Sequence, residues 1–78
     1  MYYVYVLLNK NTKELYYGYT NDLKRRLNEH NIIKNEWKLV YYEAYINESD
    51  ARGRERKLKH YGQSRNYLKK RIKKSLGI

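Results

Sequence analysis

The hydrophobic pattern first marks out three strands. Residues 2–8 and 14–19 are rich in Tyr, Val and Leu and alternate between two faces, and residues 37–46 form a third stretch of this kind. Residues 9–13 are polar and turn-prone, so the first two strands are expected to pair as an antiparallel hairpin. Gly18 removes a side chain from the second strand, which leaves room there for close approach of another backbone or a ligand.

A helix is expected directly after the hairpin. Asn21 is its expected N-cap, and the helix runs to about Asn31. Leu23 and Leu27 are four residues apart and form its apolar stripe. This short amphipathic pattern predicts a helix packed against one face of the sheet.

Two further helices are expected after the third strand. The first of them is capped by Asn47 or Ser49 and ends near Gly62, and the other is capped by Ser64 and ends at Gly77. The inward positions are apolar with one exception: Ala51, Glu55, Leu58, Leu68, Ile72 and Leu76. An acid on an inward stripe needs a partner or a metal ion, so Glu55 is a candidate functional residue.

These elements follow the order β-β-α-β-α-α in a chain of 78 residues. The pattern predicts a single domain, residues 1–78, without linkers or repeats. Its expected fold is α+β, an α/β sandwich in which a small three-stranded antiparallel sheet is flanked by three helices.

The composition indicates how the protein is stabilised and where in the cell it is expected to act. It has no cysteine, so neither a disulfide nor a thiolate zinc site can stabilise it. No apolar run approaches the roughly 20 residues of a membrane span, and residues 1–4 lack the features of a signal peptide. We therefore expect a cytoplasmic protein, nucleoid-associated when it acts, that has no membrane partner.

The charge is distributed unevenly. The formal net charge is +10, from 18 Lys and Arg against 8 Asp and Glu. Residues 1–51 contain seven of each kind, whereas residues 52–78 contain eleven basic residues and one acid. Such a basic segment predicts a polyanionic partner, nucleic acid first, because each phosphate contact releases counterions. A merely solvated surface is the alternative.

Side chains that can take part in catalysis lie at defined spacings along the chain. Arg26 and His30 are four residues apart on the first helix, so they point the same way. Tyr5 and Tyr16 lie in the two hairpin strands and can join them. Phenol, guanidinium and imidazole groups together can bind a phosphate and move a proton. This arrangement requires Tyr5 and Tyr16 to share one face of the sheet.

Each of these residues also has a structural alternative. The tyrosines suit ordinary half-buried strand positions, and His30 suits the C-terminal end of a helix dipole. The charged residues can form ion pairs within their own helices. The pairs within reach are Arg26 with Asp22 or Glu29, and Glu55 with Lys59 or Arg52.

Taken in order, these segments resemble the GIY-YIG nuclease superfamily, in particular its small stand-alone members, which are similar to the N-terminal nuclease domain of the bacterial excision-repair excinuclease. Residues 3–5 (Tyr-Val-Tyr) stand at the Gly-Ile-Tyr position and residues 16–18 (Tyr-Tyr-Gly) at Tyr-Ile-Gly. Residues 18–31 resemble the family's first helix, and residues 51–59 resemble the helix with its metal-binding glutamate. Two residues depart from the pattern: Tyr3 replaces the glycine, and Tyr19 replaces a lysine that some relatives carry near the phosphate.

The resemblance implies a hydrolase, a metal-dependent DNA endonuclease of the GIY-YIG type with a role in DNA repair. It implies weak sequence preference and selectivity for branched, nicked or flapped DNA. Glu55 would hold one magnesium ion (Mg²⁺, or Mn²⁺), and Arg26 would stabilise charge on the phosphate. Tyr5 and His30 are alternatives for activating water, and Tyr16 would position the water or the phosphate. Asn66 is the nearest candidate for a polar amide that often follows the glutamate helix.

DNA is the expected partner, with a protein partner supplying specificity. The expected DNA-binding residues are basic: Lys24, Arg25, Arg65, Lys69, Lys70, Arg71, Lys73 and Lys74. The alternative function is a non-catalytic nucleic-acid-binding domain that keeps the fold and the basic face, and RNA binding is a third. The joint presence of the two phenols, Arg26, His30 and Glu55 favours the enzyme.

Overall fold

The computed structural model describes residues 1–31 and 36–78, and the side chains of residues 30 and 31 lie outside this description. The elements are β1 (Tyr2–Asn9), β2 (Leu15–Thr20), α1 (Leu23–Asn31), β3 (Trp37–Tyr45), α2 (Glu48–His60) and α3 (Gly62–Arg71). The expected order β-β-α-β-α-α and the α+β fold are confirmed.

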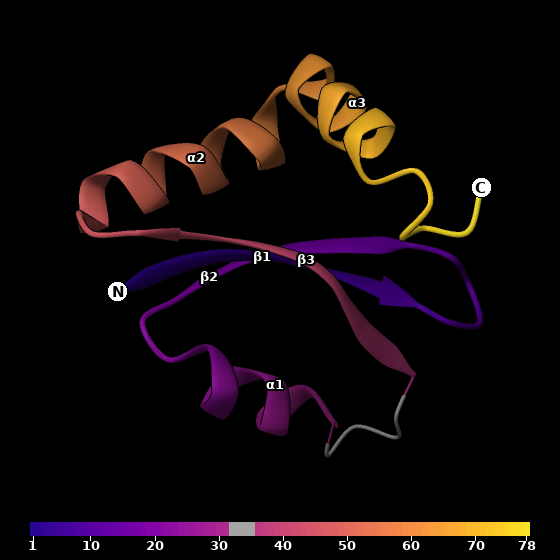
Figure 1. Cartoon of the computed structure of the whole chain (residues 1–78), viewed down its shortest axis with the longest axis horizontal. Coiled ribbons are helices and arrows are strands. Elements are labelled where there is room, and N and C mark those ends of the chain that lie inside the picture. Colours follow the sequence, from indigo (N-terminus) through magenta and orange to yellow (C-terminus); the bar gives the residue numbers. More distant parts are fainter. Residues whose placement is uncertain (32–35) are drawn as a thin grey trace.

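The sheet is antiparallel and has the strand order β2-β1-β3. Seen edge-on, it has α1 on one face and both α2 and α3 on the other (Figure 1). Since β1 is central, β2 and β3 are the edges of the sheet, and helices cover its two faces. A side chain on β2 can therefore meet groups from either helical layer.

The main core lies between the sheet and the pair α2 and α3. Val4 and Val6 of β1 pack there with Ala51 and Leu58 of α2 and with Leu68 of α3. These expected inward positions of the two helices are thus confirmed as buried. On the other face of β1, Tyr5 and Leu7 are also buried, beside α1. Both faces of the central strand are consequently inaccessible to solvent.

A half-buried ionic group holds α2 against β3. The Arg54 guanidinium donates to the Glu43 carboxylate from Nε at 3.0 Å and from Nη2 at 3.0 Å. The hydroxyl groups of Tyr41, at 2.6 Å, and of Tyr45 donate to the same carboxylate. Burial opposes ionisation of Glu43, but these bonds outweigh it and lower the pKa of the carboxyl. The group therefore acts as a fixed charge that clamps the two elements.

The caps of the first two helices were only partly predicted. Asp22, and not Asn21, caps α1: the Arg25 amide donates to Asp22 Oδ1 at 3.1 Å. Aspartate is as good an N-cap as asparagine and adds negative charge at the positive end of the dipole. In α2 the cap is Asn47, whose Oδ1 accepts from the Ser49 amide at 2.8 Å.

The bounds of the third helix were predicted wrongly. It begins at Gly62, ahead of the expected cap Ser64, and its N-cap Tyr61 makes no side-chain capping bond. The Ser64 amide donates to the Tyr61 carbonyl at 3.1 Å, so Ser64 already lies inside the first turn. The helix ends at Arg71 rather than near Gly77, which follows in a turn with φ of 79°.

Candidate active site

The register of the hairpin brings the two candidate phenols together. Tyr5 pairs with Gly18, and Leu7 pairs with Tyr16, so Tyr5 and Tyr16 share the sheet face that α1 covers. Their ring centroids are 6.1 Å apart. Tyr5 is 0% exposed, whereas Tyr16 on the edge strand is 37% exposed. The required common face is confirmed, with one buried and one accessible phenol.

Gly18 makes room for the ring of Tyr5. A Cβ atom at this glycine would lie 2.3 Å from Tyr5 Cζ and 2.4 Å from its hydroxyl oxygen. The sequence predicted the approach of another backbone or a ligand at Gly18, whereas the structure shows a side chain of the neighbouring strand there. No other residue type leaves this space free.

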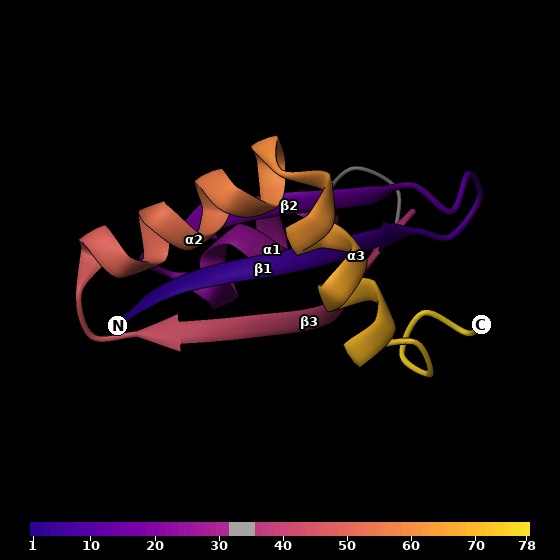
Figure 2. The same cartoon turned by 90° about the horizontal axis from the view of Figure 1, so that it is seen from above.

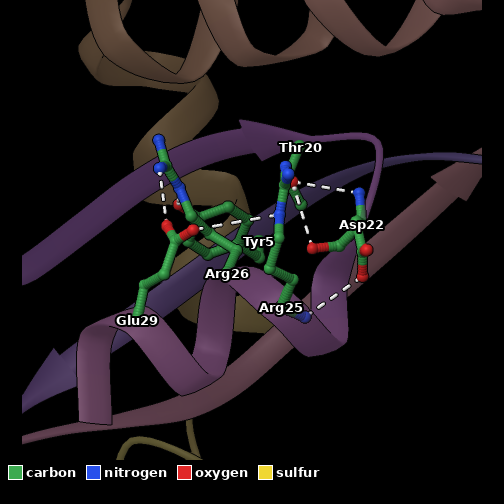
Figure 3. Close-up of polar contacts among 6 residues, drawn as sticks. All are labelled: Tyr5, Thr20, Asp22, Arg25, Arg26 and Glu29. Atoms are coloured by element: carbon green, nitrogen blue, oxygen red, sulfur yellow. Dashed lines mark hydrogen bonds and ion pairs between the residues drawn. The ribbon is translucent and has the colours of Figure 1, made fainter. Parts of the chain in front are cut away.

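Arg26 reaches the site from α1. Its Nε donates to the Tyr5 hydroxyl at 3.2 Å, and its Nη1 donates to Glu29 Oε2 at 3.2 Å (Figure 3). The helix-surface ion pair is thus present with Glu29, whereas Asp22 bonds the Arg25 amide instead. One guanidinium joins a buried phenol to an exposed carboxylate.

The environment of Tyr5 keeps its phenol protonated. Burial raises its pKa and outweighs the opposite effect of the hydrogen bond from Arg26. In the free protein Tyr5 is therefore a neutral group. Tyr5 can act as a base only after its own phenol has lost its proton, and further positive charge at the site is needed to favour that phenolate.

Glu55 enters from α2, on the opposite side of the sheet. Its side chain is 21% exposed, and its Oε2 lies 3.3 Å from Lys59 Nζ. The same Nζ lies 5.9 Å from the centroid of the Tyr16 ring. The pairing with Lys59, one of the structural alternatives, is therefore present, and Lys59 is the residue that lies near both the acid and the accessible phenol at the β2 edge.

A metal ion at this position would have one protein carboxylate. The described residues contain no group of three or more His, Cys, Asp or Glu that could hold an ion. Glu55 is a hard oxygen ligand and already has a positive charge, that of Lys59, within 3.3 Å. It fits an ion that keeps most of its waters and takes further ligands from a phosphate.

The remaining candidates differ in their placement. The backbone of His30 belongs to α1, but its side chain lies outside the described part of the structure. Asn66 is exposed on α3, and none of the hydrogen bonds within the described residues joins it to Tyr16 or Glu55. Its exposed position gives no further support for placing Asn66 in the site.

Two residues at the site were not predicted. Trp37, at the start of β3, meets the Tyr16 ring edge-on, with centroids 6.4 Å apart. Lys59 links Glu55 to the same ring. The spacing of Lys59 from Glu55 was a visible signal, whereas the position of Trp37 follows only from the pairing of β1 with β3.

The basic residues form more than one group. Lys24 and Arg25 are exposed on α1, and the basic residues between positions 69 and 74 are exposed on the other side of the sheet. From above, α3 runs across β1 toward β3, away from β2 (Figure 2). Arg65 has a structural contact, because its Nη1 donates to the Leu58 and Lys59 carbonyls, each at 2.9 Å. It thereby caps the end of α2.

The fold and the site define a class of protein. It is a small α+β domain whose edge strand carries an accessible phenol between an arginine from one helical layer and a carboxylate from the other. Residues 1–68 match the family model of the GIY-YIG catalytic domain, and the chain belongs to this family. No curated protein and no solved structure matches the chain.

Family membership has general consequences. A GIY-YIG domain implies nuclease activity with DNA as substrate, and nucleases of this family generally use a divalent metal. Among the described helices, none combines the length and apolar character that crossing a bilayer requires.

Proposed function

We propose that the protein is a divalent-metal-dependent endonuclease that hydrolyses DNA phosphodiester bonds at the β2 edge. The observation that carries the proposal is the contact of Arg26 Nε with the Tyr5 hydroxyl at 3.2 Å, with Tyr16 beside it. Glu55 comes from the other helical layer, and its partner Lys59 lies 5.9 Å from the centroid of the Tyr16 ring. A phosphate at the exposed Tyr16 would thus meet positive charge from both helical layers.

Glu55 is the residue that would hold the metal ion, Mg²⁺ or Mn²⁺. Mg²⁺ commonly binds proteins through one or two carboxylates and completes its coordination with waters and substrate phosphate. Such an ion supplies positive charge for the oxygens of the phosphate and a more acidic bound water. Binding at Glu55 requires the Lys59 ammonium to move away, which its half-exposed, flexible side chain permits.

The other residues act directly on the phosphate and the water. Arg26 would exchange Glu29 for a phosphate oxygen and stabilise the charge that develops there. Tyr16, exposed at the edge, would orient the phosphate or the attacking water. Tyr5 and His30 remain the two candidates for accepting the proton of this water. The protonated resting state of Tyr5 means that, as the base, it depends on positive charge supplied with the substrate.

We further propose a role in DNA repair with weak sequence preference. Lys and Arg contacts to the phosphate backbone position DNA without reading its bases. Nicked, flapped and branched DNAs are therefore the substrates of choice for a first test. The non-catalytic alternative has one observation in its favour: Arg26 and Glu55 each form an ion pair within their own helix.

Cleavage of a panel of labelled DNA structures, with Mg²⁺ or Mn²⁺ and with EDTA, distinguishes the two functions. We expect Glu55→Gln to abolish cleavage and leave DNA binding within about twofold, because one protein carboxylate carries the ion. Arg26→Ala should reduce cleavage by at least about 10²-fold. Glu14→Gln, the same change at an exposed turn residue, serves as the control. Cleavage by Glu55→Gln at the wild-type rate would refute the role of Glu55, and no cleavage of any substrate by the wild type would exclude the enzyme.

A further inference from the structure

A second cluster of arginines lies beside the proposed site, at the end of β2 where α1 and α2 begin. Arg25 and Arg26 of α1 and Arg52 of α2 line a hollow of about 290 Å³. Glu48 is the one acid among the residues that line it. Arg25 and Arg26 share the carboxylate of Glu29, and Arg52 pairs with Glu48. Three guanidinium groups against two carboxylates leave an excess of positive charge, which an anion in the hollow would compensate.

Arg52 is held in a defined orientation. Its Cζ lies 4.4 Å from the centroid of the Tyr19 ring, the distance of a cation–π contact. Its Nε donates to Glu48 Oε2 at 3.2 Å, and the Tyr19 hydroxyl donates to the same oxygen at 2.7 Å. The Tyr19 ring is in turn stacked on Tyr2, with an interplanar angle of 9°. The contact with Tyr19, which does not depend on Glu48, therefore orients the guanidinium before any ligand binds, and this lowers the entropic cost of binding.

The hollow is continuous with the proposed site. Arg26 lines the hollow and also donates to the Tyr5 hydroxyl. Arg52 lies three residues before Glu55 on α2, so the two side chains are neighbours on one side of this helix. A strand of DNA whose phosphate lies at Tyr16 would thus have a neighbouring phosphate within reach of the hollow.

We propose that this hollow binds a second phosphate of the DNA strand that is cleaved, with Arg52 as its main ligand. The planar guanidinium presents two parallel donors, which match two oxygens of a phosphate. Its present partner Glu48 is half exposed, so the ion pair is weak and a phosphate can replace the carboxylate. The proposal rests on the proposed function for the identity of the polyanion.

Binding in the absence of divalent metal tests the subsite separately from cleavage. We would measure the affinity for a fluorescent duplex by anisotropy as a function of salt. Arg52→Ala should weaken binding about tenfold and reduce the slope of log K against log[salt] by about 0.9, the value for a single phosphate neutralised on duplex DNA. Arg52→Lys keeps the positive charge but lacks the two parallel donors of the guanidinium. It should restore the salt slope but only part of the affinity.

Lys57→Ala is the matched control on the same helix, because its exposed side chain lies about 140° around α2 from Arg52. It should change affinity at most about twofold and leave the salt slope unchanged. A purely structural role of Arg52 predicts a lower melting temperature with an unchanged slope. An unchanged slope in Arg52→Ala would therefore overturn the subsite.

Substrates with one neutral methylphosphonate linkage then locate the phosphate. In the wild type, neutralising the linkage next to the cleaved one should raise KM about as much as Arg52→Ala does, with little change in kcat. The Arg52→Ala variant should be insensitive to that linkage and remain sensitive to the others. Equal sensitivity of wild type and variant at every position would refute the assignment. Absence of all cleavage would refute the proposed function, while the salt slope would still decide on phosphate binding.

Discussion

Replacing Gly18 with alanine is expected to displace the ring of Tyr5 and to damage both stability and activity. The added Cβ would lie 2.3 Å from Tyr5 Cζ, whereas ordinary contact begins at 3.4 Å, so the ring must move by about 1.1 Å. Tyr5 is 0% exposed, and the ring therefore cannot swing into solvent. Overpacking of this kind costs about 1–3 kcal/mol in the free energy of unfolding.

Activity should fall further than stability alone would explain. The Tyr5 hydroxyl accepts from Arg26 Nε at 3.2 Å, and a ring shift of this size disturbs that hydrogen bond. A misplacement of roughly 1 Å in a catalytic group can cost about 10²-fold in rate. We expect the Gly18→Ala protein to be folded at room temperature, with a much slower cleavage of DNA than the wild type.

Urea unfolding followed by circular dichroism measures the stability, with Gly53→Ala as the matched control. A Cβ atom at Gly53 meets nothing within 4 Å, and Gly53 lies inside α2. The same substitution should therefore stabilise the protein there by about 0.5–1 kcal/mol. In a Tyr5→Leu background, Gly18→Ala should cost less, because the atoms that clash are gone. A Gly18→Ala protein as stable and active as the wild type would refute the reasoning.

Three further predictions concern burial, acid stability and DNA binding. Tyr17→Phe should raise the free energy of unfolding by about 1 kcal/mol in urea titrations, since the buried Tyr17 hydroxyl has no hydrogen-bond partner among the described residues. The lowered pKa of Glu43 means that its stabilisation is complete above its ordinary value of 4.5 and disappears as the pH falls through the lowered value. Glu43→Gln should therefore cost about 1–3 kcal/mol at pH 7, and the difference from wild type should shrink in unfolding curves below about pH 4.5. The test of DNA binding replaces four exposed basic residues by Gln: Lys69, Lys70, Arg71 and Lys73. The slope of log K against log[salt] should fall by up to about 0.9 for each phosphate that is no longer neutralised. An unchanged slope would show that these four residues do not contact the DNA.

The strand pattern stated a condition for the meeting of the two phenols. Side chains alternate along a strand, so Tyr5 and Tyr16 share a face only in a suitable hairpin register, and the structure shows that register. The register then pairs Tyr5 with Gly18, and this explains why a glycine is required at that point. The alternation of side chains along each strand thus identified which residues can share the face on which Tyr5 and Tyr16 lie.

The helix ends and the contacts between layers were less predictable. Asn21 and Asp22 are equally good caps, so local chemistry could not choose between them. The approach of Lys59 to Tyr16 depends on how far α2 reaches over the sheet, which packing of the whole domain determines. The same holds for Trp37, whose place beside Tyr16 follows from the pairing of β3 with β1. Sequence spacing specifies contacts within an element but not between layers.

The position of the site on an edge strand follows from the way in which the sheet is covered. Tyr5 on the central strand is buried, and its hydroxyl accepts a hydrogen bond from Arg26. The edge strand β2 exposes Tyr16, and there the two helical layers can each contribute a charged group to one ligand. The clamp between Glu43 and Arg54 keeps α2 in place on the far side of the sheet. Loosening that clamp should therefore alter the placement of Glu55, the residue that follows Arg54 on α2, relative to Arg26.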